Sequence, residues 1–179
     1  MAVPAAAERI EIRVRHLQQL FNLIDPSPFH DRDLDPAADE FIESWARTLP
    51  TGVPLALLVY VDEPSTQSSD IEVLRDSVQQ FYRRKADAAS RRLRDLFRRG
   101  RISLLIAVLF LATLGVIANT LAGVLHGTVG AIAREGLLIV GWVAMWRPLE
   151  IFLYDWWPIR AKRKLFDRLA AMPVSVQYR

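Results

Sequence analysis

Residues 102–125 read ISLLIAVLFLATLGVIANTLAGVL, a run of 24 residues without a charged side chain. A helix rises about 1.5 Å per residue and the hydrocarbon core of a bilayer is about 30 Å thick, so about 20 apolar residues are enough to cross it. A soluble core helix of this length would carry a polar stripe, and Ser103, Thr113, Asn119 and Thr120 do not form one. The run therefore predicts a transmembrane helix at 102–125.

Basic residues stand directly before this predicted helix, where residues 91–101 read RRLRDLFRRGR. Positively charged residues beside a membrane span stay preferentially on the cytoplasmic side. We therefore expect a cytoplasmic N-terminus. Arg98, Arg99 and Arg101 are expected at anionic lipid headgroups, where each cation contributes about 1 kcal/mol.

A second transmembrane helix is predicted at residues 131–154, after an outer loop at 126–130. Arg147 and Glu150 are spaced i, i+3 on one face of this helix and are expected to pair inside the membrane. A second basic group follows and predicts a cytoplasmic C-terminus; its headgroup-binding residues are Arg160, Lys162, Arg163 and Lys164. Because the hydrophobicity of 131–154 is interrupted, a re-entrant or interfacial segment is the alternative.

Composition limits the classes of protein that fit. The 179 residues contain no cysteine, which excludes disulfides and thiolate chemistry. The net charge is −6 for residues 1–69, +5 for 70–101, −1 for 102–157 and +5 for 158–179. Cations thus gather beside the predicted membrane segments, as membrane topology and anionic lipid require. We therefore expect lipid contacts and no nucleic-acid partner.

The other residues predict a small cytoplasmic α/β domain. Residues 9–15 alternate between apolar and charged side chains, which is typical of a half-exposed strand. The apolar run at 55–61 is typical of a buried central strand, and residues 173–178 alternate again. A lone C-terminal strand is unstable and must join a sheet. The predicted fold class is membrane α+β: a two-helix transmembrane hairpin with a cytoplasmic α/β domain of about three strands, built from both chain ends.

Helices are expected between these strands. Asp35 and Pro36 mark a helix start, and this helix runs to about residue 49 with Phe41, Ile42 and Trp45 on its apolar face. Apolar residues then recur at helical spacing from residue 70 to the first span, without proline. The predicted divisions are 1–69, the N-terminal part of the domain; 70–101, a long juxtamembrane helix; 102–125; 126–130; 131–154; and 155–179, a C-terminal helix and strand that return to the domain.

His30, Asp31, Asp33 and Asp35 form the densest group of potential metal ligands. Imidazole and carboxylate groups bind divalent cations. No H-E-x-x-H pattern, glycine-rich phosphate loop or G-x-S-x-G turn accompanies them. A structural role is the favoured alternative, in which Asp35 caps a helix and Asp31 or Asp33 pairs with the arginines of 70–101.

Residues 25–36, DPSPFHDRDLDP, are followed by Glu40, Phe41 and Ile42. This segment resembles one found in a group of uncharacterised bacterial inner-membrane proteins, and the resemblance covers about a quarter of the chain. It implies a location in the bacterial inner membrane. It implies no activity.

Gly115, Asn119, Gly123 and Gly127 recur every four residues in and after the first predicted span. Small residues let helices approach closely, and asparagine forms hydrogen bonds across such a contact. Two uses of this helix-packing stripe remain open. One is packing against the second span near Gly141, and the other is self-association between chains.

The leading hypothesis for function is a non-enzymatic, multi-pass protein of the bacterial inner membrane. Its cytoplasmic domain would act as a protein-interaction or assembly scaffold, with a protein partner or a second copy of the chain bound to it and no cofactor. Two alternatives remain. The chain would be a subunit of an oligomeric channel or transporter with Asn119 on its path, or a metal-dependent membrane enzyme using the cluster at residues 30–35.

Overall fold

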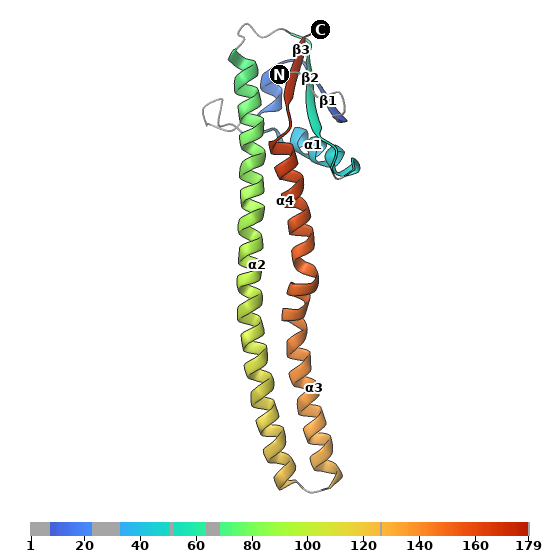
Figure 1. The fold of residues 1–179 in the computed structure, drawn as a ribbon, viewed down its shortest axis with the longest axis vertical. Coiled ribbons are helices and arrows are strands. Elements are labelled where there is room, and N and C mark those ends of the chain that lie inside the picture. The colour runs from blue at the N-terminus through green and yellow to red at the C-terminus, as the bar shows by residue number, and fades with distance from the viewer. Residues whose placement is uncertain (1–7, 23–32, 51, 64–68, 126, 179) are drawn as a thin grey trace. The chain divides into compact units, whose positions relative to one another are not determined.

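The computed structural model describes residues 8–22, 33–50, 52–63, 69–125 and 127–178 (Figure 1). The chain divides into two compact units. Unit 1 combines residues 1–89 with residues 161–179, and unit 2 contains residues 90–160. Unit 1 therefore draws on both ends of the chain.

Unit 1 contains a three-stranded parallel sheet. Its strands are β1 (Glu8–Val14), β2 (Leu55–Val61) and β3 (Val174–Tyr178). The order is β1-β2-β3, with Ile10 opposite Leu57 and Leu57 opposite Val174 (Figure 1). The predicted central position of 55–61 is confirmed, and the C-terminal strand has found the sheet that a lone strand needs.

Helices complete the core of unit 1. They are α1 (Pro36–Thr48), the first part of α2 (Ser69–Val124) and the end of α4 (Trp156–Ala170). Buried strand residues such as Ile10 and Val59 belong to the same apolar cluster as Ile42, Val78 and Leu169 of the helices. The helices therefore bury one set of alternating strand side chains, and the charged residues between them in β1 stay exposed.

The helix α2 is continuous over 56 residues. It covers nearly all of the two segments predicted at 70–101 and 102–125. Gly100 lies within it, and a Cβ atom at this position would lie only 2.8 Å from Cγ2 of Ile151. A larger side chain at this position would therefore collide with Ile151 unless that side chain shifted.

The connection after α2 is shorter than predicted, because α3 (Thr128–Glu150) starts inside the expected loop at 126–130. Gly127 has a φ of +83°, in the left-handed region that glycine adopts without strain. A Cβ atom at Gly130 would collide with the carbonyl oxygen of Leu125. These two glycines permit a tight turn, so the helix resumes three residues before the expected start at 131.

A π-helix (Ile151–Asp155) joins α3 directly to α4. Pro148 lies inside α3 and has no N–H to donate, which weakens the helix just before this segment. The indole N–H of Trp156 donates to the carbonyl oxygen of Phe152 at 2.9 Å. A side chain thus satisfies a backbone acceptor inside the π-helix, where the α-helical pattern is interrupted.

Small residues line the contact between α2 and α3 in unit 2. Ala107, Leu114 and Ala118 of α2 are buried. Gly141 of α3 is also buried, and a Cβ atom there would lie 2.5 Å from Cδ1 of Leu111. The two helices approach closely at Ala107, Ala118 and Gly141 because these positions carry little or no side chain.

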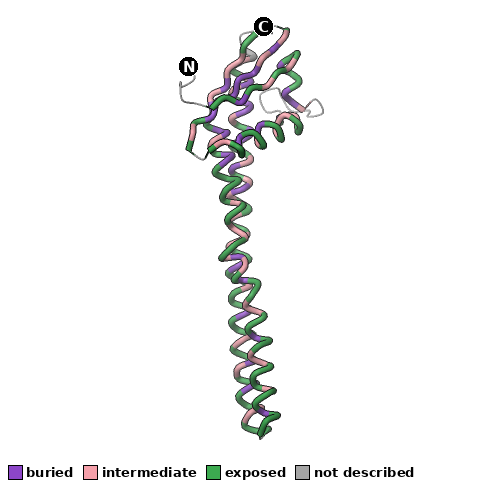
Figure 2. Tube along the Cα trace, turned by 90° about the vertical axis from the view of Figure 1, so that its right-hand side faces the viewer, coloured by how far each residue is buried: buried purple, intermediate pink, exposed green. Residues whose placement is uncertain are grey.

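Much of the length of these two helices is exposed (Figure 2), and many of the exposed side chains are large and apolar. Among the described residues, only three exposed large apolar side chains lie outside residues 102–157, namely Phe41, Trp45 and Tyr178. Two helices are long and apolar enough to cross a membrane, and only 17% of the most apolar window of each is buried. A helix in the core of a soluble protein would have most of that window buried.

Candidate functional site: the charged network and exposed face of α1

Asp35 fixes the start of α1. Its Oδ1 accepts hydrogen bonds from the backbone N–H groups of Ala37 at 2.9 Å and Ala38 at 3.3 Å. Pro36 follows in the first turn, where a helix needs no N–H donor. The carboxylate also lies at the positive end of the helix dipole. The predicted capping role of Asp35 is confirmed.

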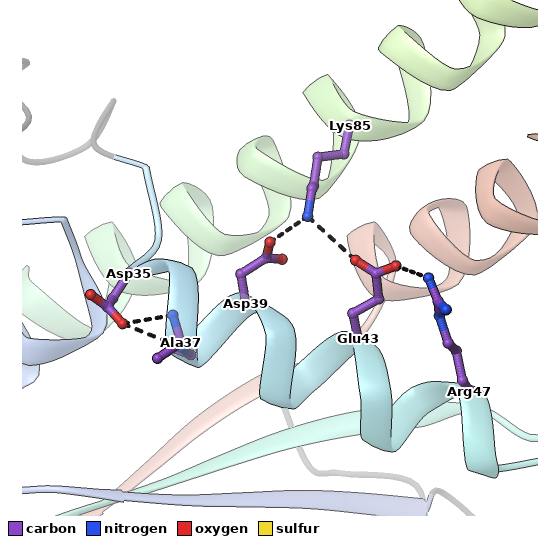
Figure 3. A network of polar contacts seen from close by, with 7 residues as sticks. Asp35, Ala37, Asp39, Glu43, Arg47 and Lys85 are labelled. Carbon is purple, nitrogen blue, oxygen red and sulfur yellow. Dashed lines mark hydrogen bonds and ion pairs between the residues drawn. The ribbon is translucent and has the colours of Figure 1, made fainter.

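A network of charged side chains joins α1 to α2 (Figure 3). The Lys85 ammonium on α2 forms an ion pair with Asp39 and lies 3.6 Å from Oε2 of Glu43. Glu43 also pairs with Arg47 one turn further along α1. The side chains of Asp39 and Glu43 are 18% exposed and that of Lys85 is 28% exposed. These charges are therefore less screened by water than an open surface pair.

Aromatic rings also surround Lys85. Its Nζ lies 5.2 Å from the ring centroid of Phe81, 5.9 Å from that of Tyr82 and 5.0 Å from that of Phe166 on α4. A cation over an aromatic ring contributes about 0.5 to 2 kcal/mol, with the larger values at desolvated sites. One lysine thus links α1, α2 and α4.

Tyr82 brings a buried hydroxyl to this network. The residue is fully buried, and neither its Oη nor Oδ1 of Asp39 has a hydrogen-bond partner within the described parts of the chain. Burial raises the pKa of Tyr82, and the negative charges of Asp39 and Glu43 raise it further. The phenol is therefore held in its neutral form.

One face of α1 is exposed, and it carries two aromatic rings. We predicted that Phe41 and Trp45 face the core with Ile42, but they are 44% and 47% exposed. The buried positions of α1 are Ile42 and Ala46. The apolar stripe of α1 is wider than the part that the sheet and helices cover, which leaves the two rings outside with their centroids 5.9 Å apart.

Charges of opposite sign flank the two rings. Glu40 precedes Phe41 and Arg47 follows Trp45, and both charged residues are exposed. We call these four residues the aromatic face of α1. Lys85 of α2 binds α1 and contacts Phe166 of α4. The aromatic face of α1 therefore lies on a helix whose position in the core is fixed.

The residues of the predicted metal cluster have separate roles where they are described. Asp33 forms an ion pair with Arg84 of α2 at 2.6 Å, as the structural alternative predicted, and Asp35 caps α1. His30 and Asp31 lie outside the described residues. Within the described residues there is no group of three or more histidine, aspartate or glutamate side chains that would hold a metal ion.

The predicted helix-packing stripe is not the contact between α2 and α3. A Cβ atom at Gly115 or Gly123 would have no atom within 4 Å, and Asn119 is exposed. Gly127 lies beyond the end of α2 and so does not share a helix face with the other three. Packing within the chain uses a neighbouring face of α2, and the stripe at 115, 119 and 123 stays uncovered.

Arg147 and Glu150 form the predicted i, i+3 pair, with Nη1 and Oε2 3.1 Å apart. Arg147 also lies 3.7 Å from Oδ2 of Asp155, and the indole N–H of Trp146 donates to Oε1 of Glu150 at 3.0 Å. Every residue predicted at the lipid headgroups is exposed: Arg98, Arg99, Arg101, Arg160, Lys162, Arg163 and Lys164.

Sequence reasoning did not single out Lys85 or Tyr82 as site residues. A usable signal was present, because Asp39, Glu43 and Arg47 follow one another at i, i+4 spacing along α1. That spacing predicts a charged row on one face of a helix. The partner of this row on α2 is Lys85, and which residue of α2 meets α1 depends on tertiary packing. Helical periodicity in the sequence gives no information about that packing.

Comparison of the chain with models of protein families, with curated proteins and with solved structures gives no match.

Proposed function

We propose that this chain is a non-enzymatic, two-span integral membrane protein that assembles with copies of itself and acts as a scaffold. The exposed apolar surface of residues 102–157 supports insertion into lipid, because water would not solvate it and a bilayer would. The exposed arginines and lysines beside it support contacts with anionic headgroups. The resemblance at residues 25–36 supports the bacterial inner membrane, with both termini in the cytoplasm.

The aromatic face of α1 carries the proposal of self-assembly. Tryptophan and other aromatic residues are enriched at the energetic centres of protein interfaces, and Phe41 and Trp45 are the exposed pair in unit 1. They lie on a helix whose position is held by Lys85, so little ordering would be needed on binding.

The occupant we propose for this face is a second copy of the same face. Most oligomers of soluble and membrane domains are symmetric, and a two-fold contact places the same patch on both sides. If two α1 helices meet antiparallel, Phe41 lies opposite Trp45 of the second copy. Glu40 then lies opposite Arg47 of that copy, and Arg47 opposite its Glu40. The charge order along α1 is therefore complementary to itself.

The test is the oligomeric state of the full chain in lipid nanodiscs or mild detergent, measured by sedimentation. We expect Trp45→Glu to weaken association at least about tenfold, since it puts a charge at the centre of the contact. Glu40→Arg should weaken it, because it places like charges opposite one another. Arg47→Glu should also weaken it, and it additionally removes the pair with Glu43, so the double exchange is the decisive variant. The double exchange of both residues should restore association to within about threefold of the unsubstituted chain.

The matched control is Asp167→Arg, which reverses an exposed charge of α4 that pairs with Arg163. This variant should associate as the unsubstituted chain does. A monomeric unsubstituted chain, or oligomers insensitive to all three single substitutions on α1, would contradict the proposal.

A second contact between copies is proposed in unit 2, at the uncovered residues Gly115, Asn119 and Gly123. Small residues permit close approach of helices, and the Asn119 amide can form hydrogen bonds across the contact. Asn119→Leu should leave insertion unchanged and weaken the oligomers. Oligomers of unchanged stability in this variant would remove the second contact but not the one on α1.

A further inference from the structure

Unit 1 contains a cavity of about 630 Å³ at the amino ends of β2 and β3. Its walls are residues 52–55, Arg75 and Gln79 of α2, Arg168 of α4 and residues 171–173. Its size is within the range of small-molecule sites. None of the roles described above uses it.

The walls of the cavity are mostly apolar. Val53, Leu55 and Met172 line it, and Leu55 and Met172 are buried. Three polar side chains interrupt this lining: Arg75 and Gln79 of α2, and Arg168 of α4. No carboxylate is among the lining residues that the structure describes.

Arg168 is held in place by the chain itself. Its Nη2 donates to the backbone carbonyl oxygens of Pro50 at 3.1 Å and Val53 at 2.9 Å. These two bonds orient the planar guanidinium and leave its other N–H groups without a partner among the described residues. An arginine fixed in this way loses little side-chain entropy when it binds a ligand.

Arg75 has no ion pair or hydrogen bond to any described residue, although it is half-buried. Gln79 is oriented by donating its Nε2 to the carbonyl oxygen of Met172 at 3.3 Å. Arg75 and Arg168 have no carboxylate partner within the described part of the chain, and two such cations beside an apolar wall create a positive potential that an anion would relieve.

We propose that this cavity binds an organic anion, with a phosphate or carboxylate group on Arg75 and Arg168 and an apolar part against Val53, Leu55 and Met172. A lipid headgroup with its chain and a water-soluble organic phosphate share this chemistry. The proposal does not depend on self-assembly or on membrane insertion.

Phenyl phosphate is the probe, because it combines the two features and dissolves in water. Binding to the full chain in phosphatidylcholine nanodiscs would be measured by calorimetry. We expect saturable binding, and at least tenfold weaker binding of both inorganic phosphate and phenol. Octyl phosphate separates the two sources: tighter binding than phenyl phosphate indicates a lipid, and equal or weaker binding indicates a soluble organic phosphate.

Arg75→Gln is the main variant, since Arg75 makes no contact that the fold requires, and it should weaken phenyl phosphate binding at least tenfold. Arg168→Lys keeps the charge but loses the planar fork, and it should weaken binding without preventing folding. The matched control is Arg163→Gln, which changes an exposed arginine of α4 outside the cavity. Absence of saturable binding, equal binding of phenol, or binding unchanged by Arg75→Gln would overturn the proposal.

Discussion

At the scale of single residues, Lys85 joins α1 to the rest of the core of unit 1. It forms an ion pair with Asp39, lies 3.6 Å from Oε2 of Glu43 and contacts the rings of Phe81 and Phe166. Removing one member of a partly buried charge cluster leaves the others without compensation, which costs more than the cluster itself contributes. We therefore expect both truncation and loss of charge at this position to destabilise unit 1.

Lys85→Met should lower the free energy of local opening of α1 by about 2 kcal/mol, because it leaves the Asp39 carboxylate without its cation in a poorly solvated site and Glu43 with Arg47 alone. Backbone amides of α1 would then exchange about 30-fold faster with solvent, as hydrogen exchange on the full chain would measure. The control is Arg163→Met, which removes an exposed ion pair with Asp167 whose atoms are 3.6 Å apart. It should change the free energy of local opening of α1 by less than about 0.5 kcal/mol. Equal effects of the two substitutions would contradict the role of Lys85.

Because burial raises the pKa of Tyr82, we expect the folded chain to lose stability at high pH. Its pKa is higher in the folded chain than the value of about 10 in an unfolded chain, so above pH 10 the folded state binds more protons. The contribution of Tyr82 to the free energy of unfolding should be constant below about pH 10. Above that pH it should fall by up to about 1.4 kcal/mol per pH unit.

The measurement is the unfolding midpoint of the full chain between pH 9 and 11.5. Tyr82→Phe should remove this part of the pH dependence, whereas Tyr178→Phe, at an exposed tyrosine, should keep it. The same slope in the unsubstituted chain and in Tyr82→Phe would show that Tyr82 ionises freely.

At the scale of elements, β3 shows how distant segments depend on each other. Met172 and Val174 are 1% exposed, and β3 pairs along β2. Removing residues 172–179 should therefore expose the core and raise the rate of proteolysis within residues 8–63 at least about tenfold. Gln177→Ala, at an exposed position of β3, should leave proteolysis unchanged. Equal resistance of the truncated and full chains would show that the sheet does not need β3.

Hydrophobic patterning predicted the elements well. The period of two at residues 9–15 and 173–178, the unbroken run at 55–61 and the cap at Asp35 each correspond to an observed element, because each is a local property of the chain. The connection between the long helices is shorter than the loop predicted at 126–130, because Gly127 and Gly130 permit a turn that lets α3 start at Thr128. The hydrophobic pattern of a helix does not show how much of its apolar face the neighbouring elements cover. We therefore predicted that Phe41 and Trp45 lie in the core, whereas they are exposed.

The candidate sites were less predictable than the elements. The capping role of Asp35 and the pairing of Asp33 followed from local chemistry and from the charge of 70–101. The contacts of Lys85 and the cavity beside Arg75 and Arg168 bring together residues that are far apart in sequence. A single sequence contains periodicity and charge but not the register in which helices pack.

At the scale of the whole molecule, the central claim is that two helices cross a membrane and leave both chain ends on one side. The claim rests on the exposed apolar surface of 102–157 and on the cations that flank it. Since the chain has no cysteine, a single introduced thiol reports the location of one position without background.

The most direct test is labelling of three single-cysteine variants in spheroplasts with a membrane-impermeant maleimide. Thr128→Cys, at the connection between the two spans, should react in intact spheroplasts. Arg9→Cys and Gln177→Cys, in β1 and β3, should react only after the membrane is opened. Reaction of positions 9 and 177 from opposite sides, or equal reaction of all three in intact spheroplasts, would contradict the account.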